Sequence, residues 1–144
     1  MADHNKLNDL VQTALDGKAG YEQAAEKVDD ASLKTLFTQY AQQRATYATE
    51  LQGVVRAAGG TPTDHGSAAA GLHRGWIGLK DALTGGDKPI LAECIRGEEH
   101  AVKEYKSAME DGDVSTEAKT VISKQHGEIE QALTHMNSLK ASHA

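Results

Sequence analysis

Residues 33–55 read LKTLFTQYAQQRATYATELQGVV, and this stretch decides the fold class. Its apolar residues return every three or four positions, which is the spacing of residues on one face of an α-helix. It also lacks proline, which would remove a backbone donor and clash with the preceding turn. The stretch therefore predicts a long helix at 31–58. The residues expected to face the core are Leu33, Leu36, Phe37, Tyr40, Arg44, Tyr47, Leu51, Val54 and Val55.

The same periodicity elsewhere in the chain predicts three more long helices and one short one. Asp30 is a suitable N-cap for the helix at 31–58, because an aspartate side chain accepts hydrogen bonds from the first free amides of a helix. Asp87 is expected to cap a later helix in the same way, with Pro89 just inside it. The short helix carries Trp76 on its apolar side. The four further predicted helices are 5–28, 68–84, 88–110 and 115–141.

The lengths of the connections predict how these helices are joined. Tight turns at 29–30 and 111–113 make two antiparallel hairpins. The link at 59–86 is much longer, and at about 1.5 Å per helical residue or about 3.5 Å per extended one it can travel the length of a bundle. We therefore expect an all-α protein with one domain at 1–144. Its architecture is an up-down-down-up four-helix bundle with one long crossover that contains the short helix.

Composition excludes several classes of function. The net charge of −6 is spread along 144 residues without a basic stripe, so nucleic acid is not an expected partner. No apolar run approaches the roughly 20 residues of a membrane span, and the opening MADHNKLNDL lacks the apolar core of a signal peptide. The single cysteine, Cys94, falls in an apolar stripe, where a buried reduced thiol is expected. These features favour a cytoplasmic protein.

Four polar residues interrupt the inward-facing stripes, one on each long helix: Lys18, Arg44, Glu98 and Gln125. Each lies about 12–15 residues, or about 20 Å, from its hairpin turn, so we expect them to meet in one layer at mid-height. Two placements stay open for Lys18, whose ammonium either joins this layer or extends to the surface. Mid-helix glycines at the same level predict a close helix approach, a π-bulge or a pocket. These glycines are Gly17, Gly97 and Gly127.

At this point the chain resembles the ferritin-like superfamily, and in particular a bacterial four-helix-bundle family classed as a domain of unknown function. Members of this kind are often associated with stress. The resemblance covers most of residues 5–140. The segments that carry it are DGKAGYEQAAE, LKTLFTQYAQQRATYATEL, LHRGWIGLKDALTGGD and ILAECIRGEEHAVKEY.

The resemblance implies where a di-iron site would lie. In di-iron relatives, each half of the bundle supplies one Glu and one Glu-x-x-His motif. Glu-x-x-His occurs nowhere in this chain, and only two of the corresponding positions are acidic. By resemblance, the single Glu positions fall on Lys18 and Glu98, and the two motifs fall on Arg44/Tyr47 and Gln125/Glu128.

We therefore interpret the polar layer as a degenerate, metal-free site in which Arg44 pairs with Glu98. Lys18, Gln125, Tyr47 and Glu128 would complete its hydrogen bonds. Charges buried without partners would cost several kcal/mol each. No nucleophile–base arrangement is visible, so we predict no catalytic residues and no cofactor. The protein is expected to be a non-enzymatic accessory bundle that acts through its surface, with a protein partner or by self-association.

Two alternatives stay open. In the first, the protein is a metal-binding protein or oxidase that uses shifted carboxylates to hold iron or manganese. In the second, Arg44 anchors a small anionic ligand in a mid-bundle pocket, because its guanidinium matches carboxylates and phosphates. Most of the seven histidines are expected at the surface, with His126 closest to the layer. The carboxylates of the alternative metal site are Glu22, Glu50, Glu98 and Glu128.

Overall fold

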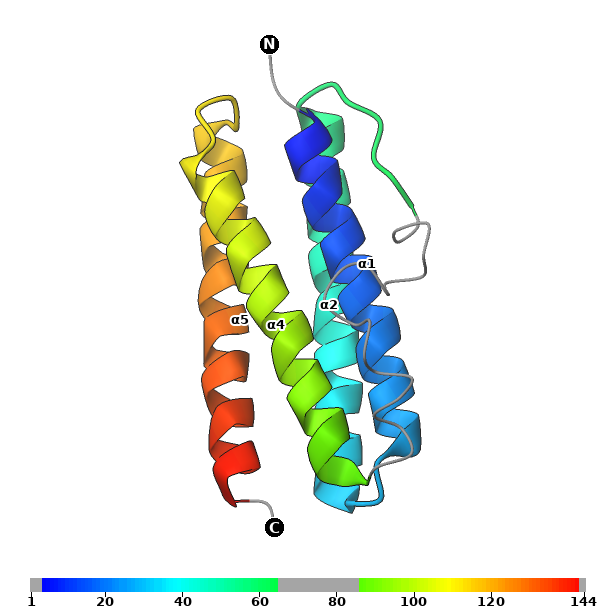
Figure 1. Ribbon diagram of the computed structural model, residues 1–144. Helices are drawn as coiled ribbons and strands as arrows, with labels where there is room; N and C mark the ends of the chain where they lie inside the picture. The colour runs from blue at the N-terminus through cyan, green and yellow to red at the C-terminus, as the bar shows by residue number, and fades with distance from the viewer. Residues whose placement is uncertain (1–3, 65–85, 143–144) are drawn as a thin grey trace.

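The computed structural model describes residues 4–64 and 86–142, and these two ranges contain four helices (Figure 1). Within them there is no strand, so the predicted all-α four-helix bundle is confirmed. The predicted short helix at 68–84, with Trp76, lies outside the described residues. The four helices are α1 (His4–Lys27), α2 (Ala31–Ala57), α4 (Asp87–Glu110) and α5 (Thr116–Ser142).

The helices follow the predicted order of directions. In Figure 1, α1 and α5 run from the top to the bottom of the bundle, whereas α2 and α4 run from the bottom to the top. Helix α1 packs against α2 and α4, and α5 packs against α4 and more loosely against α2. Helices α2 and α4 therefore occupy diagonal corners. The chain leaves α2 at one end of the bundle and enters α4 at the other.

Aspartates fix the end of the bundle where α1 meets α2. The Asp30 carboxylate accepts hydrogen bonds from the backbone N–H groups of Ser32 and Leu33 at 2.7 and 3.2 Å, as expected of an N-cap. The prediction for Asp87 is wrong, because α4 begins at Asp87 itself and Gly86 occupies the cap position. The Asp87 carboxylate instead accepts from the N–H groups of Asp29 and Asp30, at 2.8 and 2.9 Å. Those amides belong to the turn between α1 and α2, so Asp87 ties α4 to the first hairpin.

Replacing Asp87 by asparagine is expected to lower the free energy of unfolding by about 1–3 kcal/mol. A single amide oxygen cannot reproduce two hydrogen bonds to a charged carboxylate. Urea denaturation followed by circular dichroism measures the change. Asp113→Asn, in the exposed turn between α4 and α5, is the matched control and should leave stability within about 0.5 kcal/mol. Equal effects of the two substitutions would contradict this role of Asp87.

The core consists of two apolar clusters, one in each half of the bundle. The first surrounds Leu10, Leu51 and Ile122, and the second surrounds Phe37 and Leu91. Each cluster draws side chains from all four helices. The core is therefore built of two apolar layers stacked along the bundle.

Polar side chains occupy the level between the two clusters. On α2, Arg44 lies between Ala41 of the second cluster and Tyr47 of the first. On α4, Glu98 lies between Ile95 and Ala101 in the same way. None of the helices in residues 4–64 and 86–142 has the length and apolar character needed to cross a membrane.

Candidate functional site

An ion pair between Arg44 and Glu98 lies at the centre of the bundle. Arg44 Nη1 and Nη2 each donate to one oxygen of the Glu98 carboxylate, and both donor–acceptor distances are 2.5 Å. Arg44 is 2% exposed and Glu98 is 0% exposed. The bidentate geometry is the strongest arrangement that an arginine and a carboxylate can form. It crosses the bundle along its diagonal, from α2 to α4.

The rest of the guanidinium of Arg44 is also surrounded. Its Nη2 donates to Oε1 of Gln43 at 3.1 Å. Its Cζ lies 5.3 Å from the ring centroid of Tyr21 and 5.5 Å from that of Tyr47, which is the range of cation–π attraction. Two aromatic rings, an amide and a carboxylate therefore stabilise one buried cation.

The mid-helix glycines have different roles. An added Cβ at Gly17 would lie 3.4 Å from Cγ of Arg44, so α1 packs closely against the arginine stem at this residue. Gly97 is buried on α4, next to Glu98. The expected close approach at Gly127 is wrong, because a Cβ there would meet nothing within 4 Å. Of these glycines, Gly17 therefore lies at a close contact, where α1 faces Arg44.

A second set of hydrogen bonds connects α5 to α2 and α4. The Tyr105 hydroxyl donates to Oε1 of Gln125 at 2.6 Å, and Nε2 of Gln125 donates to Oε1 of Glu50 at 2.8 Å. The Tyr47 hydroxyl donates to Oε1 of Glu128 at 2.6 Å. Gln125 is 1% exposed. These bonds bridge the loosely packed seam between α2 and α5 at mid-height.

Burial keeps the tyrosines of this region protonated. It raises the pKa of Tyr40 to about 12, and the negative charge of Glu98 adds to the shift. Burial also raises the pKa of Tyr21, and again Glu98 adds to it. The pKa of Tyr47 rises through burial and through its hydrogen bond to Glu128. A neutral phenol can donate a hydrogen bond to a carboxylate, as the Tyr47 hydroxyl does to Glu128.

Burial and the ion pair have opposite effects on the pKa of Arg44, and the effect of the ion pair is larger. Removal from water lowers the pKa of the guanidinium, but attraction to Glu98 and the hydrogen bonds to it outweigh this effect. The pKa of Arg44 therefore lies above its ordinary value. The guanidinium therefore keeps its positive charge while it is buried beside Glu98.

The tyrosine shifts predict alkaline unfolding. A raised pKa means that the folded bundle holds the phenolic proton more tightly than the unfolded chain does. This contribution to stability is complete below the ordinary tyrosine pKa of about 10 and is lost as the pH rises through the folded value, which for Tyr40 is about 12. Urea denaturation at increasing pH, with tyrosinate absorbance recorded in parallel, measures the loss. Tyr40→Phe should reduce the loss, and stability unchanged above pH 10 would contradict the assignment.

Lys18 does not join the central layer. Its side chain is 40% exposed, and its Nζ lies 3.2 Å from the carboxylate of Glu22, whose side chain is 56% exposed. Helix α1 turns Gly17 toward Arg44, and the next residue along a helix points about 100° away. The ammonium thus extends to the surface, one of the two placements that the sequence left open.

The four carboxylates of the alternative metal site do not converge. Glu22 pairs with Lys18 at the surface and Glu98 pairs with Arg44 in the core. Glu50 accepts from Gln125, whereas Glu128 accepts from a tyrosine. In residues 4–64 and 86–142, no group of three or more His, Cys, Asp or Glu side chains is placed to hold a metal ion.

The sequence pattern missed one buried acidic residue. Asp16 is 2% exposed, and it shares a buried strip of α1 with Thr13, Gly17 and Gly20. This strip has the helical spacing i, i+3, i+4, i+7, which a search for apolar residues overlooks. His126, expected to border the layer, is 13% exposed and its Nδ1 lies 3.4 Å from Glu130.

A comparison with known protein families identifies the family to which the chain belongs. The sequence model of a family described as a domain of unknown function, DUF2383, matches residues 3–111. The chain belongs to the DUF2383 family. The matched region includes α1, α2 and α4, and with them Arg44 and Glu98, while Gln125 and Glu128 lie beyond it. No curated protein matches the chain.

Proposed function

We propose that this DUF2383 protein is a non-enzymatic, ferritin-like bundle in which an ion pair stands in place of a di-metal site. The observation that carries the proposal is the bidentate bond between Arg44 and Glu98, both almost fully buried at mid-bundle. The order of helix directions supports the ferritin-like relationship. In such bundles, metal is held at this level by carboxylates and imidazoles from all four helices.

The electrostatics of the layer oppose a divalent cation. Both oxygens of Glu98 are engaged by Arg44, and the guanidinium already neutralises that carboxylate. A metal ion beside Arg44 would meet a fixed positive charge in a medium of low dielectric constant, where repulsion is much stronger than in water. By the resemblance, Gln125 takes the place of a motif glutamate and Tyr47 that of a motif histidine. This donor set fits a hydrogen-bonded layer better than a metal centre.

The contacts of Arg44 argue against the alternative in which its guanidinium binds a small anionic ligand. Four donor contacts of the Arg44 guanidinium go to Glu98 and Gln43. A carboxylate or phosphate ligand would have to displace Glu98, which is 0% exposed, and leave its charge buried without a partner. That exchange is unfavourable. We therefore propose that the protein acts through its surface, by contact with a partner or by self-association.

A cytoplasmic location forms part of the proposal. Cys94 is the single cysteine, and it is buried. Burial raises the pKa of its thiol, and the charge of Glu98 adds to this effect. The thiol is thus protonated and shielded, and a lone reduced cysteine suits a reducing compartment.

Titration with ferrous iron in air tests the proposal. We expect no acceleration of iron oxidation, no stoichiometric iron after desalting, and no rise in melting temperature with iron, manganese or zinc. A ligand that binds the native state raises its stability through mass action, so the melting temperature reports binding without any assumption about catalysis. Two metal ions retained per chain, together with a stabilised bundle, would overturn the metal-free assignment.

A further inference from the structure

The two hairpins of the bundle meet along two seams, one between α1 and α4 and the other between α2 and α5. These seams are built differently, because α1 packs closely against α4, whereas α5 packs only loosely against α2. Loosely packed regions of a protein open at a lower free energy than the rest of the fold. The α2/α5 seam is therefore the place where the two halves are expected to separate first.

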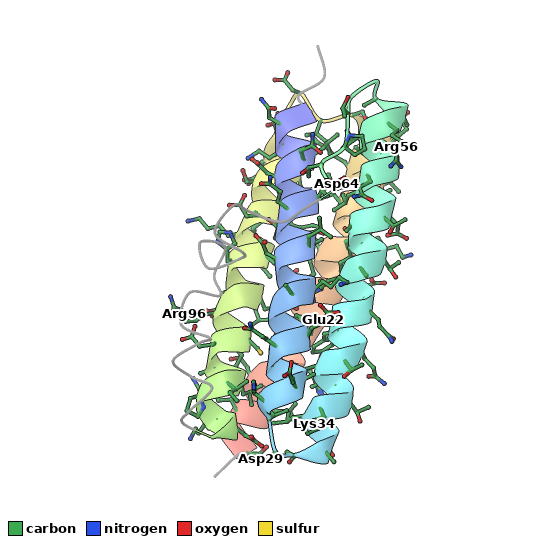
Figure 2. All side chains as sticks on the ribbon, turned by 90° about the vertical axis from the view of Figure 1, so that its right-hand side faces the viewer. Glu22, Asp29, Lys34, Arg56, Asp64 and Arg96 are labelled. Carbon is green, nitrogen blue, oxygen red and sulfur yellow. The ribbon has the colours of Figure 1, made fainter. Side chains whose placement is uncertain are left out.

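Hydrogen bonds fasten the α1/α4 seam at both of its ends. At one end, Nζ of Lys6 on α1 donates to Oγ of Ser107 on α4 at 3.0 Å. At the other end, the carboxylate of Asp87 on α4 accepts from the N–H groups of Asp29 and Asp30. Figure 2 shows Asp29 at that end, in the turn after α1. Bonds at both ends oppose separation of α1 from α4, so this seam is suited to be the hinge between the two hairpins.

The hydrogen bonds across the α2/α5 seam are confined to its middle. Within the described parts of the chain, the bonds that join these two helices are made by four residues: Tyr47 and Glu50 on α2, and Gln125 and Glu128 on α5. We call them the mid-seam bonds. Glu50 is exposed and Glu128 is half-buried, so water can reach both carboxylates. Water can therefore replace these bonds when the helices part, which keeps their net contribution to stability modest.

Hollows interrupt the α2/α5 seam on both sides of the mid-seam bonds. Toward one end, a hollow of about 470 Å³ is lined in part by Val54 of α2 and Val121 of α5. Toward the other end, a hollow of about 210 Å³ is lined in part by Leu36 of α2 and Leu139 of α5. All four side chains are half-buried. A hollow deprives the side chains around it of dispersion contacts, so apolar packing holds α2 to α5 weakly at both levels.

We propose that the bundle opens locally along the α2/α5 seam, by a turn of the two hairpins about the α1/α4 seam that breaks the mid-seam bonds. Because α4 borders the hinge, the diagonal from Arg44 on α2 to Glu98 on α4 lengthens less than the distance between α2 and α5. The ion pair therefore persists in a slightly opened bundle and limits how far it opens. Such opening exposes apolar side chains of the core while the four helices stay folded.

Cysteine labelling tests the opening on the full chain. Ala132→Cys places a thiol on α5 one helical turn after Glu128, and thus on the side that meets α2. Ala101→Cys is the matched control on α4, outside the α2/α5 seam, and the two alanines are 4% and 6% exposed. A thiol reagent should label position 132 at least about tenfold faster than position 101, because the labelling rate of a buried group reports the free energy of the opening that exposes it. Peptide mass spectrometry separates both products from labelling at the buried Cys94.

The urea dependence of labelling separates local opening from global unfolding. A local opening exposes little surface, so labelling at position 132 should change little in urea concentrations well below the unfolding transition. Labelling that requires global unfolding rises steeply with urea, as we expect at position 101. Equal rates at the two positions, or an equally steep urea dependence at both, would overturn the proposal. The titration with iron tests a separate claim, since opening of the seam does not depend on whether the core binds metal.

Tyr47→Phe tests the role of the mid-seam bonds in this opening. Added to Ala132→Cys, it should raise the labelling rate at position 132 at least about threefold, the factor that corresponds to the loss of one hydrogen bond of modest net strength. Added to Ala101→Cys, it should leave labelling at position 101 unchanged. Tyr40→Phe is the matched control on the same helix, because the Tyr40 ring packs against Tyr21 of α1 at a centroid distance of 5.3 Å. Equal effects of the two phenylalanine substitutions, or faster labelling at both positions, would contradict the proposal.

Discussion

A Glu98→Gln variant is expected to be less stable than wild type by about 3–5 kcal/mol, the usual cost of removing one member of a buried ion pair. The glutamine fills nearly the same volume, but it leaves the guanidinium of Arg44 buried at 2% exposure without a counter-charge. Two of its N–H donors would then face an amide in place of a carboxylate. The loss is therefore electrostatic rather than a matter of packing.

Urea denaturation of Glu98→Gln beside Glu99→Gln provides the measurement. Glu99 is the next residue on α4 and it is exposed, so the second variant makes the same change outside the core. Surface substitutions of this kind typically alter stability by less than about 0.5 kcal/mol. A Glu98→Gln variant as stable as Glu99→Gln would show that Arg44 does not need its carboxylate.

An Arg44→Met/Glu98→Met double variant is expected to recover most of what Glu98→Gln loses. Replacing both members of a buried pair by apolar residues removes the desolvation cost of two ions, and such replacements are often neutral or stabilising by about 1–4 kcal/mol. The flexible methionine side chains can fill the space between the two apolar clusters. The same denaturation experiment tests the recovery.

Arg44→Met alone is the necessary companion to the double variant. It should be as damaging as Glu98→Gln, since it leaves Glu98 charged at 0% exposure. The double variant should then be more stable than either single variant, which is the signature of coupled residues in a double-mutant cycle. Purely additive effects would contradict the pairing and would assign each loss to packing.

Much of the fold was predictable because apolar spacing is a strong signal over four long helices. The predicted helix at 31–58 corresponds to Ala31–Ala57 in the structure. Arg44, Glu98 and Gln125 were identified as core residues by the same reasoning, since each takes a position where the stripe demands an apolar side chain. Their burial at 2, 0 and 1% exposure shows how far periodicity alone can reach.

What could not be predicted depends on single steps around a helix or on contacts distant in sequence. Gly17 and Lys18 are neighbours, but only Gly17 faces Arg44. Asp16 is polar, so a search for apolar stripes passed over its burial. The carboxylate of Asp87 reaches the turn after α1, which lies 58 residues earlier in the chain at Asp29. Sequence spacing carries no information about such a contact.

The charged bond that joins diagonal corners also limits how the two hairpins can slide past each other. Shifting one hairpin by a single helical turn, about 5.4 Å, would separate Arg44 from Glu98. Both charges would then be buried among apolar side chains without a partner. Oily side chains alone tolerate such slippage, because one methyl group substitutes for another. Apolar side chains above and below can replace one another, but the bond between Arg44 and Glu98, together with the hydrogen bonds from α5 to α2, fixes the register of the two hairpins.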